Sequence, residues 1–154
     1  MNEKKLIFIC NTEKETKALS KKISEICRQG DVFALYGTLG MGKSVFARAF
    51  IQNLCGMTDV PSPTFTLVQM YDAPDFEVYH YDLYRLKTAD EIFELDIEEA
   101  MYEGVCLIEW PEKMGGYLPK KAIKIQITPK EQGRQIEILF NSEETYKRFL
   151  PLKD

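Results

Sequence analysis

The stretch DVFALYGTLGMGKS, residues 31–44, decides the fold of this chain. Its first part, Asp31 to Tyr36, is almost entirely apolar, which is typical of a strand buried on both faces of a parallel sheet. The remaining eight residues fit the pattern G-x-x-x-x-G-K-[ST] in full, and an amphipathic helix is predicted from Lys43 to Leu54. A buried strand, a glycine-rich loop and a helix in this order predict a phosphate-binding loop.

The residue types of this loop suit the phosphates of a nucleotide. Glycines allow successive backbone N–H groups to curl around an anion, and the start of the following helix adds its positive dipole end. We expect Lys43 to contact the β- and γ-phosphates and the Ser44 hydroxyl to ligate Mg²⁺. The predicted nucleotide-binding residues of the loop are Gly37, Thr38, Leu39, Gly40, Met41, Gly42, Lys43 and Ser44.

Two acidic residues are candidates for the metal side of such a site. Glu109 ends the apolar run 104–109, and Asp82 follows the predicted strand 77–81. A phosphate-loop hydrolase needs a carboxylate near its metal, usually at the end of a neighbouring strand, and both positions qualify. Between the loop and these acids, Ser62 and Thr64 carry hydroxyls that could reach the γ-phosphate or its metal, as in nucleotide switches.

The rest of the chain predicts an α/β fold in a single domain, residues 1–154. Helices are expected after Thr12, which can cap a helix with Glu15, across the acidic stretch Thr88 to Met101, and after Ser142. A short buried strand is expected at 5–10, a hairpin from 65–71 and 77–81, and an antiparallel pair from 123–128 and 135–140.

Composition excludes several function classes. No apolar run approaches the roughly 20 residues that cross a bilayer, so we expect a cytoplasmic protein without membrane contact. His80 is the only histidine and Cys-x-x-Cys does not occur, which argues against a zinc site. The net charge is −4 with no basic run, so strong tRNA binding by this chain alone is not expected.

The identity of the nucleotide follows only by exclusion. No Asn-Lys-x-Asp sequence follows the loop, so the usual guanine-reading motif of GTPases is missing, and ATP is the expected nucleotide. Trp110 is the only tryptophan and directly follows Glu109. Packing beside the nucleotide and packing elsewhere are both open for this side chain.

Four motifs occur together in a fixed order: GTLGMGKS at 37–44, SPTFTLV at 62–68, HYDLYRL at 80–86 and IEWPE at 108–112. Taken together they closely resemble the TsaE (YjeE) family, the bacterial ATPases of tRNA threonylcarbamoyladenosine (t6A) biosynthesis. The resemblance extends from Thr12 to Pro111. Two departures are minor: Ser44 stands where threonine is commoner but keeps the hydroxyl, and Met41 stands where a small residue is usual.

The resemblance implies a P-loop NTPase fold, with a mostly parallel central sheet, antiparallel additions and flanking helices. It implies ATP and Mg²⁺ as cofactors, slow hydrolysis by the isolated protein, and the partners TsaD and TsaB, of which TsaD performs the threonylcarbamoyl transfer. The residues it assigns are Lys43 and Ser44 at phosphate and metal, Thr64 in a switch-like loop, Asp82 as an essential acid, Glu109 on the metal side with Trp110 as its neighbour, and Thr12 near the base.

Two other functions fit parts of the sequence. A small P-loop kinase acting on a metabolite could use Arg48 or Arg85, although no arginine-rich lid insertion is visible. A nucleotide-gated binding module could use the segment 90–103, which holds seven acidic residues and no basic one. The second alternative is compatible with ATP hydrolysis.

Overall fold

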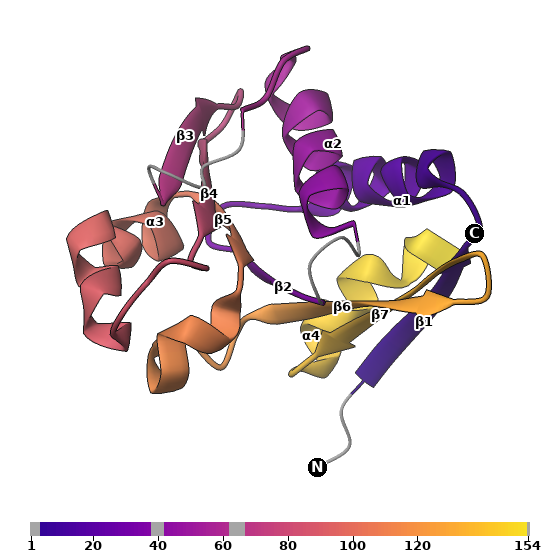
Figure 1. Ribbon diagram of the computed structural model, residues 1–154. Coiled ribbons are helices and arrows are strands. Elements are labelled where there is room, and N and C mark those ends of the chain that lie inside the picture. The colour runs from indigo at the N-terminus through magenta and orange to yellow at the C-terminus, as the bar shows by residue number, and fades with distance from the viewer. Residues whose placement is uncertain (1–3, 38–41, 62–66, 154) are drawn as a thin grey trace.

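The computed structural model describes residues 4–37, 42–61 and 67–153. Its centre is a seven-stranded sheet with the order β1-β7-β6-β2-β5-β4-β3 (Figure 1). The strands are β1 (Lys4–Cys10), β2 (Val32–Tyr36), β3 (Val68–Asp72), β4 (Glu77–Asp82), β5 (Val105–Glu109), β6 (Ile123–Lys130) and β7 (Gly133–Phe140). The helices are α1 (Glu13–Ile26), α2 (Lys43–Cys55), α3 (Ile97–Glu103) and α4 (Glu143–Phe149), with 3-10 turns η1 (Ala89–Leu95), η2 (Pro111–Tyr117) and η3 (Leu150–Lys153).

The four central strands, β6, β2, β5 and β4, run parallel, and the outer strands are added antiparallel. The α/β class predicted from the sequence is therefore confirmed, as are the hairpin β3–β4 and the antiparallel pair β6–β7. All five residues of β5 are buried, because helical segments cover both faces of the sheet at this position. The parallel centre brings the carboxyl ends of β2, β4 and β5 to one edge.

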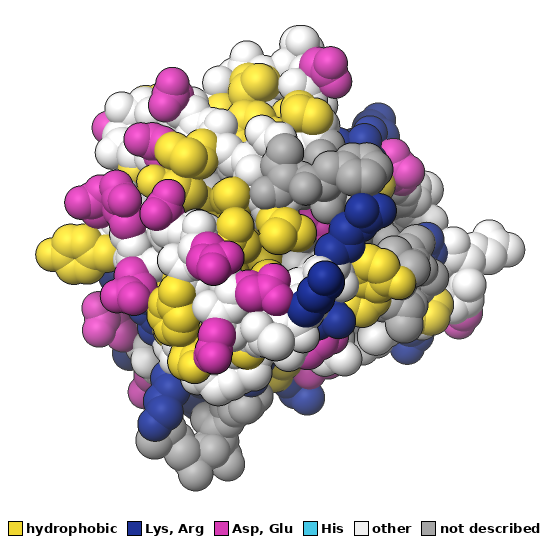
Figure 2. Space-filling view, turned by 60° about the vertical axis from the view of Figure 1, so that its left-hand side comes forward, with side chains coloured by type: hydrophobic (Ala, Val, Ile, Leu, Met, Phe, Trp, Pro, Cys, Tyr) yellow, Lys and Arg dark blue, Asp and Glu magenta, His cyan; other side chains and the backbone are white. Residues whose placement is uncertain are grey.

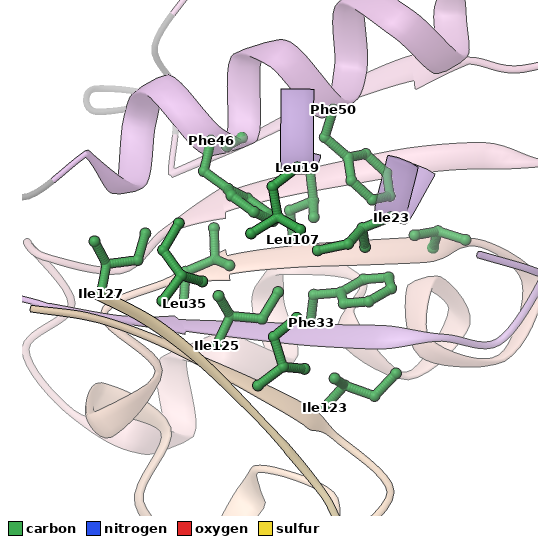
Figure 3. Close-up of a cluster of buried hydrophobic side chains, with 14 of the residues drawn as sticks. Leu19, Ile23, Phe33, Leu35, Phe46, Phe50, Leu107, Ile123, Ile125 and Ile127 are labelled. Atoms are coloured by element: carbon green, nitrogen blue, oxygen red, sulfur yellow. The ribbon is translucent and has the colours of Figure 1, made fainter. Parts of the chain in front are cut away.

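Helices α1 and α2 cover one face of the sheet. Phe46 and Phe50 of α2 and Ile23 of α1 are fully buried against side chains of β2, β5 and β6 (Figure 3). Burying each such side chain contributes about 1.5–3 kcal/mol. Thr12 caps α1 as expected, because its Oγ1 accepts a hydrogen bond of 3.2 Å from the Glu15 backbone N–H.

The acidic stretch 88–101 is not the single helix that its composition predicts. It divides at Asp96, which adopts a left-handed conformation (φ 55°) between η1 and α3. Ile92 and Ile97 are both fully buried, yet residues five apart lie about 140° from each other around a continuous helix. The break allows both isoleucines to pack into the hydrophobic cluster on the sheet face opposite α1 and α2. The prediction of one helix was therefore wrong for a packing reason.

Strand β1 was expected to be buried, and this expectation was also wrong. It pairs with β7 alone and forms an edge of the sheet. Leu6 and Cys10 face the core, whereas Ile7 and Ile9 keep 49% and 46% of their surface exposed. An antiparallel edge strand packs on one face only, and a short apolar run does not reveal that.

Candidate functional site

The candidate site lies at the carboxyl edge of the parallel strands. Asp82 and Glu109 are the last residues of β4 and β5, and the register places them directly opposite each other. Leu35 of β2 is paired with Glu109 from the other side, two residues before Gly37. Because α2 begins at Lys43, the described end of the phosphate loop, residues 42–44, meets both acidic residues at this edge although they are far apart in the sequence.

Three side chains form a chain of polar contacts at the edge. The Ser44 hydroxyl donates to Glu109 Oε1 at 3.1 Å, and His80 Nε2 lies 2.6 Å from Glu109 Oε2. Glu109 is 3% exposed and His80 is 1% exposed. Both carboxylate oxygens of this buried glutamate thus have a protein partner, which fixes its orientation.

Lys43 carries the most exceptional group of the site. Its side chain is buried, and its Nζ has no hydrogen-bond partner among the described residues. The ammonium lies 3.6 Å from the centre of the Trp110 ring, a cation–π contact. Burial lowers the pKa of Lys43, opposed by the nearby carboxylates of Glu109, Glu112 and Asp82. A buried ammonium without a hydrogen-bonded partner is costly, so the arrangement favours an anion at this position.

Trp110 lines the candidate site, and its ring packs between the Lys43 ammonium and Tyr84. It has left-handed backbone angles (φ 60°, ψ 49°) at the junction of β5 and η2. Its ring contacts that of Tyr84 at 5.0 Å between centroids, and the Tyr84 backbone N–H donates to Asp82 Oδ1 at 3.1 Å. A non-glycine residue in this conformation costs free energy, and such residues cluster at functional sites.

These groups surround a cavity of about 550 Å³. Its lining includes Gly42, Lys43, Ser44, Asp82, Glu109 and Trp110. It also includes residues where β1 runs into α1, among them Thr12, and residues of the β6–β7 turn, among them Arg134. The strand order places this second group on the other side of β2 from β5 and β4. Gly133 permits this closure, because a Cβ at this glycine would lie 2.3 Å from the Cys10 carbonyl oxygen.

The remaining predicted site residues are Gly37 and six residues that lie outside the described ranges. Gly37 is described but does not line the cavity. Outside the described residues are Thr38, Leu39, Gly40, Met41, Ser62 and Thr64. The acidic segment 90–103 lies on η1 and α3, away from the cavity lining. Figure 2 shows acidic side chains gathered among hydrophobic ones on that side of the molecule.

Sequence reasoning did not assign His80 or Arg134 to the site. His80 was noted as the only histidine and as part of the HYDLYRL motif, but it was given no role. Strand alternation puts it on the same face as Asp82, whereas its contact with Glu109 depends on the register of β4 against β5. Arg134 lines the cavity from β7, and no local signal connects it with the phosphate loop.

Within residues 4–37, 42–61 and 67–153, no three His, Cys, Asp or Glu side chains gather to hold a metal by themselves. The same ranges contain no helix long and apolar enough to cross a membrane.

Comparison with known proteins gives a consistent result. The family model described as "Threonylcarbamoyl adenosine biosynthesis protein TsaE" matches residues 10–136. A protein of Rickettsia felis named tRNA threonylcarbamoyladenosine biosynthesis protein TsaE is 40% identical over 141 residues, covering 90% of this chain and 82% of that protein. A Bacillus subtilis protein of the same name is 38% identical over 114 residues, covering 73% of this chain and 71% of the relative. The crystal structure of Bacillus subtilis YdiB superposes with a TM-score of 0.80 at 29% identity, covering 99% of this chain and 97% of that one.

Proposed function

This chain belongs to the TsaE family of threonylcarbamoyladenosine biosynthesis proteins, and from that premise we propose that it binds ATP with Mg²⁺, hydrolyses it slowly and supports t6A formation in a complex with TsaD and TsaB. The observation that carries the proposal is the buried Lys43 ammonium. It has no hydrogen-bond partner among the described residues and lines the cavity beside Ser44 and Glu109. The β- and γ-phosphates of ATP are the anion that would complete this site.

The phosphates would be held by the start of α2. Backbone N–H groups at the first turn of a helix have no partner within the helix, and its dipole favours negative charge there. Gly42 has φ 98°, a conformation that glycine adopts without strain, and places this first turn against the cavity. Lys43 would exchange its contact with the Trp110 ring for charge-assisted hydrogen bonds to phosphate oxygens.

The oxygen atoms around Ser44 fit a magnesium ion. Mg²⁺ is usually bound by one or two protein oxygens together with waters and substrate phosphates. Ser44 Oγ and Glu109 Oε1 are 3.1 Å apart and both residues line the cavity, so hydroxyl and carboxylate oxygens are available without a larger cluster of acidic ligands. When bound, the ion would neutralise negative charge on the β- and γ-phosphates.

We assign the orientation of the attacking water to Asp82. Its Oδ1 accepts a hydrogen bond from the Tyr84 N–H. The residue is 9% exposed and is paired with Glu109 in the register of β4 and β5. Tyr84 and Trp110 would restrict bulk water on this side. Thr64, in a segment between the phosphate loop and these acids, is proposed to report the presence of the γ-phosphate.

The side of the cavity at the β1–α1 junction is proposed to hold adenine and ribose. Thr12 lines this side while its hydroxyl caps α1, so that the residue is fixed by the helix. The phosphates and the base would then lie along one cavity, from α2 to the β1–α1 junction.

The test is reconstitution of the complex. This protein is mixed with TsaD and TsaB and analysed by gel filtration with ATP, with ADP and without nucleotide. We expect most complex in the presence of ATP. A partner that prefers the ATP-bound state must also raise the ATP affinity of this protein by the same factor. Isolated protein with labelled ATP should release free phosphate slowly, with no metabolite acceptor, and should not shift tRNA on a gel. Tight tRNA binding by this chain alone, or no complex with any nucleotide, would overturn the proposal.

A further inference from the structure

The buried histidine of β4 has no role in the mechanism above, although it makes the shortest contact of the site. We propose that His80 is a positioning residue: it holds Glu109 so that one carboxylate oxygen alone faces Ser44 and the metal. The inference rests on the proposed function. It states how Glu109 is oriented, in addition to the proposal that Glu109 is the acid on the metal side.

The geometry separates the two oxygens of Glu109. Oε2 lies 2.6 Å from His80 Nε2, whereas Oε1 accepts the Ser44 hydroxyl at 3.1 Å. His80 and Glu109 are both almost completely buried. With Oε2 occupied inside the protein, the carboxylate presents only Oε1 at the cavity, and it can serve a metal or its bound water through that single atom.

The direction of the hydrogen bond between His80 and Glu109 follows from the acceptor. A carboxylate oxygen accepts, so His80 Nε2 carries a hydrogen and donates to Glu109. His80 Nδ1 is buried and without a hydrogen-bond partner in the part of the chain that the structure describes. His80 therefore acts as a hydrogen-bond donor of fixed direction toward Glu109.

The fold gives His80 this position through the pairing of β4 with β5. Asp82 is opposite Glu109, and His80 is opposite Leu107, one pleat further back on the same face. The ring lies behind the carboxylate, on its inner side, and does not line the cavity. It is almost fully shielded from solvent and would act on a bound nucleotide only through Glu109.

The experiment compares substitutions that keep or remove the donor. His80→Leu removes it, and His80→Gln keeps an amide N–H near the place of Nε2. Tyr81→Phe is the matched control, because Tyr81 is also fully buried on β4 but faces the other side and donates to the Leu95 carbonyl. For each variant the measurements are the Mg²⁺ concentration that half-saturates ATP binding in calorimetry, the single-turnover hydrolysis rate, and the thermal unfolding midpoint.

We expect His80→Leu to raise the half-saturating Mg²⁺ concentration, and to lower the hydrolysis rate, by about 10-fold or more. ATP affinity without Mg²⁺ should stay at the value of the parent. His80→Gln should recover most of both losses, and Tyr81→Phe should change only the unfolding midpoint. In the Glu109→Gln background, His80→Leu should add little further loss, because the two residues act as one unit.

The outcomes separate this inference from the proposed function. Additive losses in the double variant, a His80→Gln variant as impaired as His80→Leu, or a lowered unfolding midpoint with an unchanged Mg²⁺ response would each reduce His80 to a packing residue. If His80→Leu does not fold, His80→Asn takes its place, because its amide is too short to reach Glu109. A parent protein that binds ATP without any response to Mg²⁺ would remove the proposed metal site itself, and the inference with it.

Discussion

The two parts of the sheet differ in whether they bury polar side chains. In β6, β7 and β1 the buried side chains are hydrophobic, with Ile125, Ile136 and Ile138 almost without exposed surface. At the carboxyl edge of β2, β4 and β5 the buried residues include four polar ones, Lys43, His80, Asp82 and Glu109. The two buried side-chain nitrogens without a hydrogen-bond partner among the described residues, Lys43 Nζ and His80 Nδ1, both lie at this edge.

This difference shows which part of the molecule stabilises the fold and which part lowers its stability. Burial of unpaired polar groups opposes folding, and the hydrophobic antiparallel part together with α1 and α2 offsets that cost. Substitutions at the carboxyl edge should therefore alter binding and chemistry with little loss of stability. Substitutions in the antiparallel part should do the reverse.

The largest expected effect is that of Asp82→Ala on the rate of ATP hydrolysis. Loss of a carboxylate that orients the attacking water should lower the single-turnover hydrolysis rate by about 100-fold or more, with a much smaller change in ATP affinity. Rates measured at saturating ATP, together with calorimetric affinities, check this. If affinity and rate decline equally, Asp82 instead serves ground-state binding.

Next in size is Lys43→Met on nucleotide affinity. Removing the charge-assisted phosphate contacts should weaken ATP binding by about 2–5 kcal/mol in calorimetry. Burial lowers the pKa of Lys43 in the folded protein. At pH values below this lowered pKa the buried ammonium is charged and opposes folding. Lys43→Met should therefore not lower the free energy of unfolding measured without nucleotide. A variant that unfolds more easily and still binds ATP would contradict the comparison.

In the antiparallel part, Ile138→Ala should lower the free energy of unfolding by about 2–5 kcal/mol. Ile138 is 1% exposed and belongs to the core beneath α1 and α2. Chemical denaturation measures this loss. ATP affinity of the folded fraction should equal that of the parent, and a parallel loss of affinity would mean that the two parts are coupled.

The smallest effects separate two equivalent helix caps. Thr12 and Ser142 each accept a hydrogen bond from the backbone N–H three residues on, at 3.2 and 3.1 Å. Thr12→Ala and Ser142→Ala should each lower the free energy of unfolding by about 1 kcal/mol. Only Thr12 lines the cavity, so only Thr12→Ala should also weaken ATP binding; equal affinities for the two variants would place the base elsewhere.

Much of the fold could be predicted because its signals are local. The apolar strand before the phosphate loop, the amphipathic helix after it, and the caps at Thr12 and Ser142 each depend on a few neighbouring residues. The structure contains these elements at nearly the expected bounds. The placement of Glu109 near the start of α2 could also be expected, because the carboxyl ends of parallel strands meet at one edge of a sheet.

The features that could not be predicted depend on neighbours distant in the sequence. Strand β1 is half exposed because it pairs only with β7, and the acidic helix breaks at Asp96 so that two isoleucines can reach one core. Arg134 enters the cavity lining through β7, and the tight approach of Gly133 to Cys10 requires the completed sheet. The role of a residue such as His80 depends on the register of β4 against β5, which no single-strand pattern specifies.

The most direct test of the central claim uses Trp110, the only tryptophan of the chain. Its ring lies 3.6 Å from the Lys43 ammonium, and phosphate binding should draw that charge away from the indole. Titration of the unmodified protein with ATP should change the Trp110 fluorescence in a saturable way, and Mg²⁺ should shift the midpoint to lower ATP concentration. Fluorescence that stays constant up to millimolar ATP, with and without Mg²⁺, would contradict a nucleotide site at Lys43.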